Sequence, residues 1–147
     1  MNSLSPSRLY DQNTFYDAFI KDIKNAKSLV VIESPFITNK RMQLLFPTLR
    51  KLRDKGIRII VNTKPFNEHD AIYREQAIWT VGVMQDMGID ILFTCGHHRK
   101  LAIIDDILWE GSLNILSQND SCEIMRRIKS KSITNEMIKY TRLKDWL

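Results

Sequence analysis

The most informative stretch of this chain is His98-Arg99-Lys100-Leu101-Ala102-Ile103-Ile104-Asp105, which is followed by Gly111-Ser112-Leu113-Asn114. Both the predicted fold and the expected chemistry depend on it. His98 and Lys100 are two residues apart, so on a β-strand their side chains leave the same face. The serine and the asparagine repeat this spacing on what the pattern predicts as the second strand of a hairpin. An imidazole, an ammonium, a hydroxyl and a carboxamide would then converge on one patch, which suits holding a phosphodiester and attacking its phosphorus.

This pattern, H-x-K-x-x-x-x-D followed by G-S-x-N, resembles the signature of the phospholipase D superfamily. Known members are α/β sandwiches that cleave phosphodiesters without a metal, and they bring two copies of the motif together. Because this chain holds one copy, the resemblance implies a homodimer with a shared active site and both His98 side chains in it. One His98 would attack phosphorus and form a phosphohistidine, and the other would protonate the leaving oxygen. No cofactor and no metal are expected.

The resemblance also implies roles for the other signature residues. Lys100 and Asn114 would hold the non-bridging oxygens and neutralise the charge that develops in the transition state. Ser112 would add a hydrogen bond. Asp105 belongs to the signature but lies an odd number of residues from the histidine, so on a regular strand it faces away, and we expect a structural role for it at the hairpin end.

A histidine nucleophile needs its second ring nitrogen held in place. Members of the superfamily often use a downstream acidic residue for this, and Glu123 is the candidate here. An inter-strand salt bridge is an equally good interpretation of Glu123. Glu33, at the end of a predicted strand, is either a residue that lines the site or one that caps the strand.

The hairpin is one residue shorter than is usual in the superfamily between Asp105 and Gly111. Keeping His98 opposite Asn114 requires a three-residue loop at 105–107, or a compensating bulge, and we predict one of these. A two-residue turn would slip the register by one and send the serine and asparagine to the other face. In the predicted register four apolar residues share the core-facing side: Leu101, Ile103, Trp109 and Leu113.

The composition indicates one soluble globular domain spanning 1–147. Lysine and arginine number 22 against 17 acidic residues, and the pI is near 9.3, which favours a polyanionic partner such as nucleic acid. Two cysteines are too few for a disulfide framework, and the spacing of cysteine and histidine does not match a zinc site. No segment is apolar enough to span a membrane, and residues 1–7 lack a signal-peptide pattern, so a cytoplasmic location is expected.

Helical and strand patterns alternate along the chain. The fold class predicted is therefore α/β, a mixed β-sheet flanked by helices on both faces, with parallel strands first and an antiparallel hairpin later. The expected elements are helices over 14–27, 40–55, a segment ending near Gly88, and 133–146, and strands over 28–33, 57–61, 89–94, the signature hairpin and 122–128.

Several basic residues lie near the signature in sequence. Arg99 adjoins the candidate nucleophile, and Arg126 and Arg127 follow Glu123, so these three are candidate substrate-binding residues. The C-terminal segment 133–146 is also rich in lysine and arginine. A solvated helix face is the alternative interpretation of that segment.

The function predicted is that of a metal-independent phosphodiesterase, a homodimeric nuclease that favours DNA over RNA. It would work alone or as part of a helicase or restriction system. One alternative is a phospholipid or other small phosphodiester hydrolase, although no amphipathic membrane-binding helix is evident. Another is a catalytically silent nucleic-acid-binding module, which the shortened hairpin favours.

Overall fold

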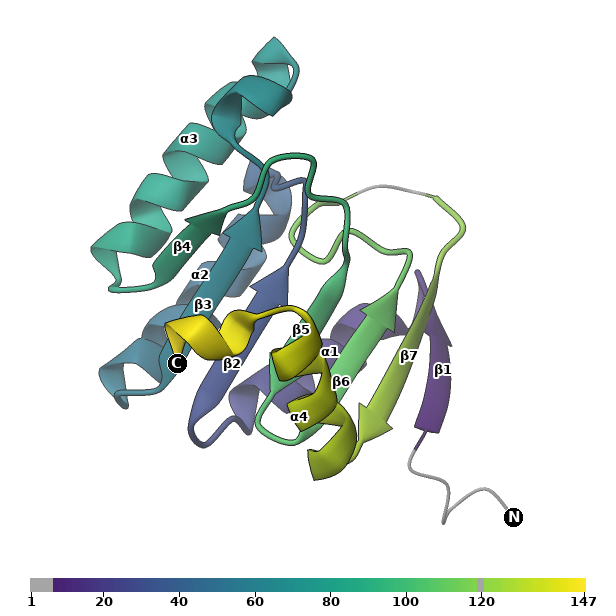
Figure 1. The fold of residues 1–147 in the computed structure, drawn as a ribbon. Helices are drawn as coiled ribbons and strands as arrows, with labels where there is room; N and C mark the ends of the chain where they lie inside the picture. Colours follow the sequence, from purple (N-terminus) through teal and green to yellow (C-terminus); the bar gives the residue numbers. More distant parts are fainter. Residues whose placement is uncertain (1–6, 119–120) are drawn as a thin grey trace.

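The computed structural model describes residues 7–118 and 121–147, which form one sheet with helices packed against it (Figure 1). The elements are, in chain order, β1 (Ser7–Asp11), α1 (Phe15–Lys24), β2 (Leu29–Glu33), α2 (Asn39–Asp54), β3 (Arg58–Thr63), the 3-10 helix η1 (Phe66–Glu68), α3 (Ala71–Asp86), β4 (Asp90–Phe93), β5 (Leu101–Ile104), β6 (Ile107–Gly111), β7 (Ile124–Lys129), α4 (Lys131–Tyr140) and the 3-10 helix η2 (Leu143–Trp146).

Among the described residues the sheet has seven strands in the order β1-β7-β6-β5-β2-β3-β4. The strands β2, β3 and β4 are parallel, whereas β5, β6, β7 and β1 join antiparallel. This arrangement confirms the predicted mixed sheet. The carboxyl ends of β2, β3, β4 and β6 meet at the upper edge in Figure 1, where β5 and β7 begin. We call this the carboxyl edge of the sheet.

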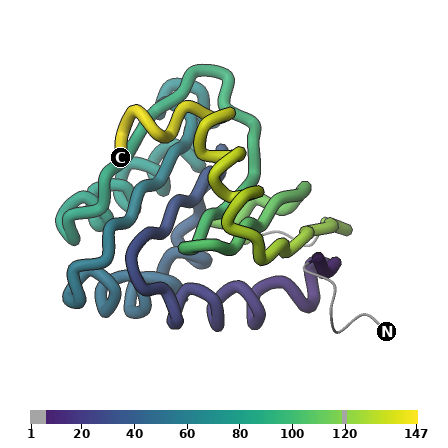
Figure 2. Tube along the Cα trace, turned by 60° about the horizontal axis from the view of Figure 1, so that its bottom comes forward, coloured from purple at the N-terminus to yellow at the C-terminus, as the bar shows by residue number. Residues whose placement is uncertain are grey.

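Helices cover both faces of the sheet, as predicted, and Figure 2 shows α1 and α4 on opposite sides of it. The larger core lies beneath α1, α2 and α3 and includes the fully buried Phe19, Leu45 and Met84. The smaller core lies beneath α4 and η2, with Ile103 of β5 and Leu143 of η2 among its members. Both faces of β5 are therefore buried, which explains its unbroken apolar run Leu-Ala-Ile-Ile.

The first two helices follow their sequence patterns. Phe15, Phe19 and Ile23 recur at helical spacing on α1, and all three are buried. Helix α2 continues through Pro47 and is followed by Gly56, which has a φ of +79°. Glycine reaches this left-handed conformation without steric cost, so it ends the helix where the sequence predicts.

Two parts of the fold differ from the expectation. Strand β1 was not predicted, because Ser7–Asp11 is a mostly exposed edge strand without apolar alternation. The predicted C-terminal helix is two elements, α4 and η2, separated at Arg142, whose φ of +62° breaks the helix. None of the described helices is long and apolar enough to cross a membrane.

Candidate active site

The signature hairpin has a tighter turn than predicted. Ile104 pairs with Ile107 across a two-residue turn, and the Gly111 N–H donates to the Lys100 carbonyl at 3.3 Å, so Lys100 lies opposite Gly111. The predicted three-residue loop, with Lys100 opposite Ser112, is therefore wrong. By the alternation of a pleated strand, the Ser112 side chain then leaves the face opposite to that of Lys100.

Trp109 explains why the hairpin takes this register. Its ring packs against Tyr10, Phe15 and Phe19, beneath α1, and its indole N–H donates to Asp22 at 2.9 Å. Trp109 therefore shares a face with Ala102 and Ile104, and the expectation that it lies on the side of Leu101 and Ile103 is wrong. Burial of this large ring with a satisfied N–H stabilises the register that the two-residue turn sets.

Asp105 holds the turn against the start of β2. Its carboxylate accepts from the backbone N–H groups of Lys27, Ser28 and Leu29 at 2.7–3.0 Å and from the Ser28 hydroxyl at 2.9 Å. Burial alone would raise the pKa of Asp105, but these hydrogen bonds outweigh it and lower the pKa. The left-handed φ of +52° at Asp105 is tolerated by aspartate. These contacts are those of a structural residue at the hairpin end.

His98 and Lys100 lie at the carboxyl edge, in the segment just before β5 rather than on the strand. The His98 side chain is exposed, and the Lys100 ammonium donates to the His98 carbonyl at 2.8 Å. Burial lowers the pKa of Lys100, and attraction to Glu123 acts in the opposite direction. Glu123, expected to orient His98, thus lies near enough to Lys100 to interact with it.

Ser112 and Asn114 follow β6 at the same edge. The Ser112 hydroxyl accepts from the Ile124 N–H at 3.0 Å and so ties this segment to β7. A Cβ atom at Gly111 would lie 2.1 Å from the Ile124 carbonyl oxygen, so only glycine allows this close approach of β6 and β7. The Asn114 side-chain oxygen is buried and has no hydrogen-bond partner among the described residues.

A buried polar network underlies the carboxyl edge. Glu33, at the end of β2, is fully buried and accepts two hydrogen bonds from Arg99 at 2.7 and 2.9 Å and one from Asn62 at 2.8 Å. Thr94 donates to the Asn62 side-chain oxygen at 2.9 Å. Arg99 is half exposed, with part of its guanidinium free to meet a ligand. This network fixes a cation beside His98 and Lys100.

His97 lies next to this network. Burial is the main cause of its lowered pKa, and Glu33, Arg99, Lys100 and His98 all interact with it electrostatically. Its Nε2 atom is buried and has no hydrogen-bond partner in the part of the chain that the structure describes. Asn62 and Thr94 were missed by the sequence reasoning. The available signal was their position, since each is a polar residue at or just after the end of an apolar strand.

The two arginines of β7 are already engaged. Arg127 forms a bidentate ion pair with Asp22 at 2.7 and 3.0 Å, and Arg126 donates to the Ser7 hydroxyl. Arg99 is also paired with a carboxylate, but its side chain is 46% exposed, against 27% for Arg127, so Arg99 is the more accessible of the two paired arginines. Among the described residues, no group of three or more histidine, cysteine, aspartate and glutamate side chains is arranged to hold a metal ion.

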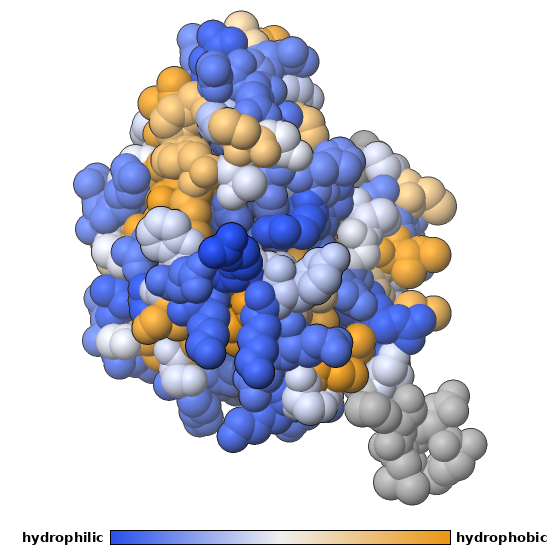
Figure 3. Space-filling model, in the orientation of Figure 1, coloured by the Kyte–Doolittle hydropathy of each residue, from blue (hydrophilic) through white to orange (hydrophobic). Residues whose placement is uncertain are grey.

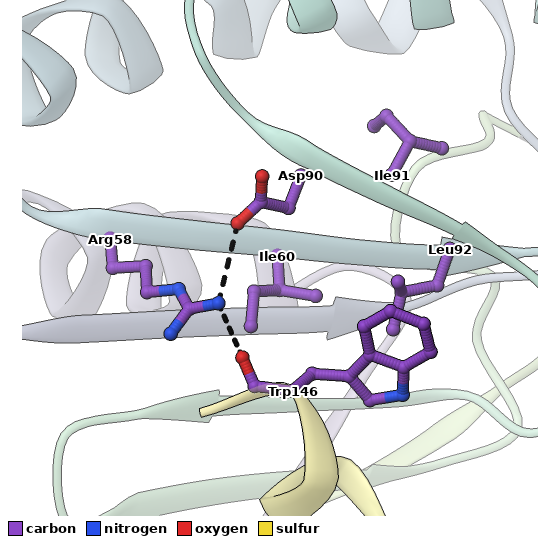
Figure 4. A pocket seen from close by; sticks show the side chains of 6 residues that line it. All are labelled: Arg58, Ile60, Asp90, Ile91, Leu92 and Trp146. Atoms are coloured by element: carbon purple, nitrogen blue, oxygen red, sulfur yellow. Dashed lines mark hydrogen bonds and ion pairs between the residues drawn. The ribbon is translucent and has the colours of Figure 1, made fainter.

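A pocket of about 280 Å³ lies at the other end of the sheet, beneath η2 (Figure 4). Trp146 covers it, and Arg58, at the start of β3, donates to the Trp146 carbonyl and pairs with Asp90 at 3.5 Å. The pocket is remote from the signature residues, because Arg58 and Asp90 begin the strands whose opposite ends form the carboxyl edge.

The fold and the edge residues together define a phospholipase D-like sandwich. A family model described as the PLD-like domain of cardiolipin synthase matches residues 19–146. The chain therefore belongs to the phospholipase D-like domain family, and the resemblance inferred from the signature is confirmed.

Solved structures share the fold at low sequence identity. Nuc from Salmonella typhimurium, a phospholipase D family member, is 13% identical with a TM-score of 0.74, over 91% of this chain and 90% of Nuc. NucT from Helicobacter pylori is 18% identical with a TM-score of 0.73, over 92% of each chain. TrmBL2, an archaeal chromatin protein with a novel mode of DNA binding, is 9% identical with a TM-score of 0.64, over 99% of this chain and 54% of TrmBL2. No curated protein matches the sequence significantly.

Proposed function

We propose that this protein is a metal-independent phosphodiesterase that cleaves nucleic acid, preferentially DNA, as a homodimer. The observation that carries the proposal is the grouping of an exposed His98, a partly buried Lys100 and Glu123 at the carboxyl edge of a phospholipase D-like fold. The net charge of +5 supports a polyanionic substrate. A DNA-binding chromatin protein among the structural neighbours agrees with this substrate class.

The chemistry proceeds in two displacement steps. A ring nitrogen of one His98 forms a bond to phosphorus as the bond to the leaving oxygen breaks, and the protonated second His98 of the dimer gives its proton to that oxygen. The second imidazole then takes a proton from water, whose oxygen displaces the first histidine from phosphorus. Lys100 and Arg99 stabilise the charge on the non-bridging oxygens, and Ser112, whose hydroxyl is bonded to Ile124, holds the segment that leads to Asn114 against β7.

Cleavage in the presence of EDTA tests this mechanism. The wild-type protein should nick a supercoiled plasmid with EDTA present, and His98→Ala and Lys100→Ala should lose at least about a hundredfold of the rate. Lys24→Ala, which removes an exposed lysine at the end of α1, is the matched control and should retain full activity. Equal cleavage by His98→Ala, or inhibition by EDTA, would contradict the mechanism.

Three further measurements test the covalent intermediate, the dimeric assembly and the class of substrate. Wild-type protein quenched during turnover should carry one strand of the cleaved nucleic acid, joined through its terminal phosphate to His98 by an acid-labile, alkali-stable bond, and His98→Ala should carry none. Sedimentation should give a dimer, because one chain supplies one His98. An active, strictly monomeric protein would rule out the shared site. Hydrolysis of phosphatidylcholine vesicles without cleavage of DNA would indicate a lipid substrate instead.

A second candidate function is a nucleic-acid-binding module without catalysis, and the register of the hairpin favours it. Lys100 lies opposite Gly111 rather than Ser112, so the four polar side chains of the signature do not share one face by pleat geometry alone. The chain leaves strand geometry before β5 and after Gly111, so the alternation of a pleated strand does not by itself set the directions of the His98 and Asn114 side chains. DNA retention that weakens steeply with salt, without cleavage, would establish this second function.

A further inference from the structure

Four aromatic residues gather at the carboxyl edge, on the side of η1. Phe36 follows β2, Phe66 lies in η1, Tyr73 is in the first turn of α3, and Phe93 ends β4. The Phe66 and Phe93 rings are 5.1 Å apart, and the Phe36 and Tyr73 rings are 6.2 Å apart. Tyr73 and Phe93 are 42% and 43% exposed. We call these four residues the aromatic shelf.

Hydrogen bonds join the aromatic shelf to the candidate active site. The Thr63 hydroxyl donates to the Pro35 carbonyl at 3.2 Å, beside Phe36. The Gly96 N–H donates to the Glu68 carboxylate at 2.9 Å, so η1 is fastened to the segment that carries His97 and His98. The shelf and the Glu33 network therefore form one continuous edge. Figure 3 shows hydrophobic side chains over β4 and its carboxyl end, beside a hydrophilic surface.

Positive charge accompanies the exposed rings. The Lys64 ammonium lies 3.8 Å from the centre of the Phe36 ring, and Arg99 and Lys100 lie further along the edge. Two carboxylates also lie here: Glu68 of η1 accepts from the Gly96 N–H, and Asp70 immediately precedes α3, so the cations lie on the side of the shelf that faces the signature residues. Aromatic rings interleaved with cations are the surface that stacks unpaired bases while binding the phosphates between them. A duplex cannot use such rings, because its bases already stack on one another.

We propose that the aromatic shelf binds unpaired bases, so that the protein prefers single-stranded nucleic acid to duplex, with the backbone of the strand running over Arg99 and Lys100. This inference rests on the proposed nucleic-acid substrate and adds strand selectivity to it. Tyr73 and Phe93 present the most exposed rings and carry most of the stacking. Phe36 and Phe66 are half-buried and support them.

Binding in the cleavage-deficient His98→Ala background tests the inference without requiring turnover. Fluorescence anisotropy at one fixed salt concentration compares a labelled single-stranded oligonucleotide with the blunt duplex of the same sequence. Tyr73→Ala and Phe93→Ala should each weaken single-strand binding on the order of tenfold, since stacking on an aromatic side chain contributes that much per base. Duplex binding should change less than about twofold, because it depends on phosphate contacts.

Trp79→Ala is the matched control. Trp79 is also on α3 and is 51% exposed, but it packs against Phe46 of α2, outside the shelf. It should leave single-strand binding unchanged, and thermal melts of all variants should report retained folding. Equal losses for single strand and duplex, or an equal loss for Trp79→Ala, would overturn the inference.

The experiment distinguishes the inference from the proposed activity. If the wild-type protein never cleaves but its single-strand binding depends on the aromatic shelf, the proposed nuclease activity is refuted and the proposed role of the shelf is supported. If the protein cleaves nucleic acid but shows no preference for single strands that depends on the shelf, the proposed role of the shelf is refuted and the proposed nuclease activity is supported.

Discussion

Replacing Arg99 by leucine measures how much the ion pair between Arg99 and Glu33 contributes to the free energy of unfolding. Arg99 supplies two of the three hydrogen bonds to the fully buried Glu33 carboxylate, and Asn62 supplies the third. Removing one partner of a buried pair costs about 3–5 kcal/mol. Because 46% of the Arg99 side chain is exposed, water can reach the vacated space, so we expect about 3 kcal/mol. This corresponds to a fall in Tm of about 6–12 °C for a domain of this size.

Urea unfolding of the two single variants and the double variant separates lost charge from lost packing. Glu33→Gln should cost about 1–2 kcal/mol, since the amide keeps one acceptor and the freed guanidinium returns to water. The double variant should cost about 1–3 kcal/mol less than the sum, because a neutral amide needs no cation.

The size of the deficit gives the refutation. A loss below about 1 kcal/mol for Arg99→Leu in urea unfolding would refute a buried charge at Glu33 that depends on Arg99.

Three further changes test the hairpin. Gly111→Ala should lower the free energy of unfolding in urea by about 3 kcal/mol, because its Cβ would lie 2.1 Å from the Ile124 oxygen and 2.9 Å from the Met125 Cα. Gly82→Ala is the control: its Cβ would meet nothing within 4 Å inside α3, so stability should be unchanged or increased. Asp105→Asn keeps the left-handed turn but loses the charge that accepts four hydrogen bonds. The wild-type protein should be more stable than Asp105→Asn by about 2 kcal/mol of unfolding free energy near pH 7. Since the pKa of Asp105 is lowered in the folded state, this difference should shrink as pH falls below about 4. A difference that stays constant from pH 7 to pH 3 would contradict a charged, hydrogen-bonded Asp105. Trp109→Phe should cost about 2 kcal/mol of unfolding free energy, through lost volume and the lost bond to Asp22, and an unchanged stability would show that Trp109 does not anchor the register.

The sequence was sufficient for the architecture because the patterns that specify it are local. Phe15, Phe19 and Ile23 mark one face of α1, and Gly56 marks the end of α2. Strand β1 was missed because its position depends on pairing with β7, not on its own residues. The signature located His98, Lys100 and the segment after β6 at one edge, but it carried no information on Asn62 and Thr94, whose roles arise from strands meeting in space.

The register of the hairpin could not be predicted from its own strands. Leu101–Ile104 is apolar at every position and is buried on both faces, so hydrophobic alternation does not distinguish one register from the next. The choice is made elsewhere, by the Trp109 ring beneath α1 and by the bonds from Asp105 to the start of β2. A turn shortened by one residue thus leaves the core packing intact. The shift in register affects the signature residues at the carboxyl edge. Lys100 and Ser112 are held by hydrogen bonds at this edge, whereas His98 lies before β5 and Asn114 lies after β6, outside the paired residues of the hairpin.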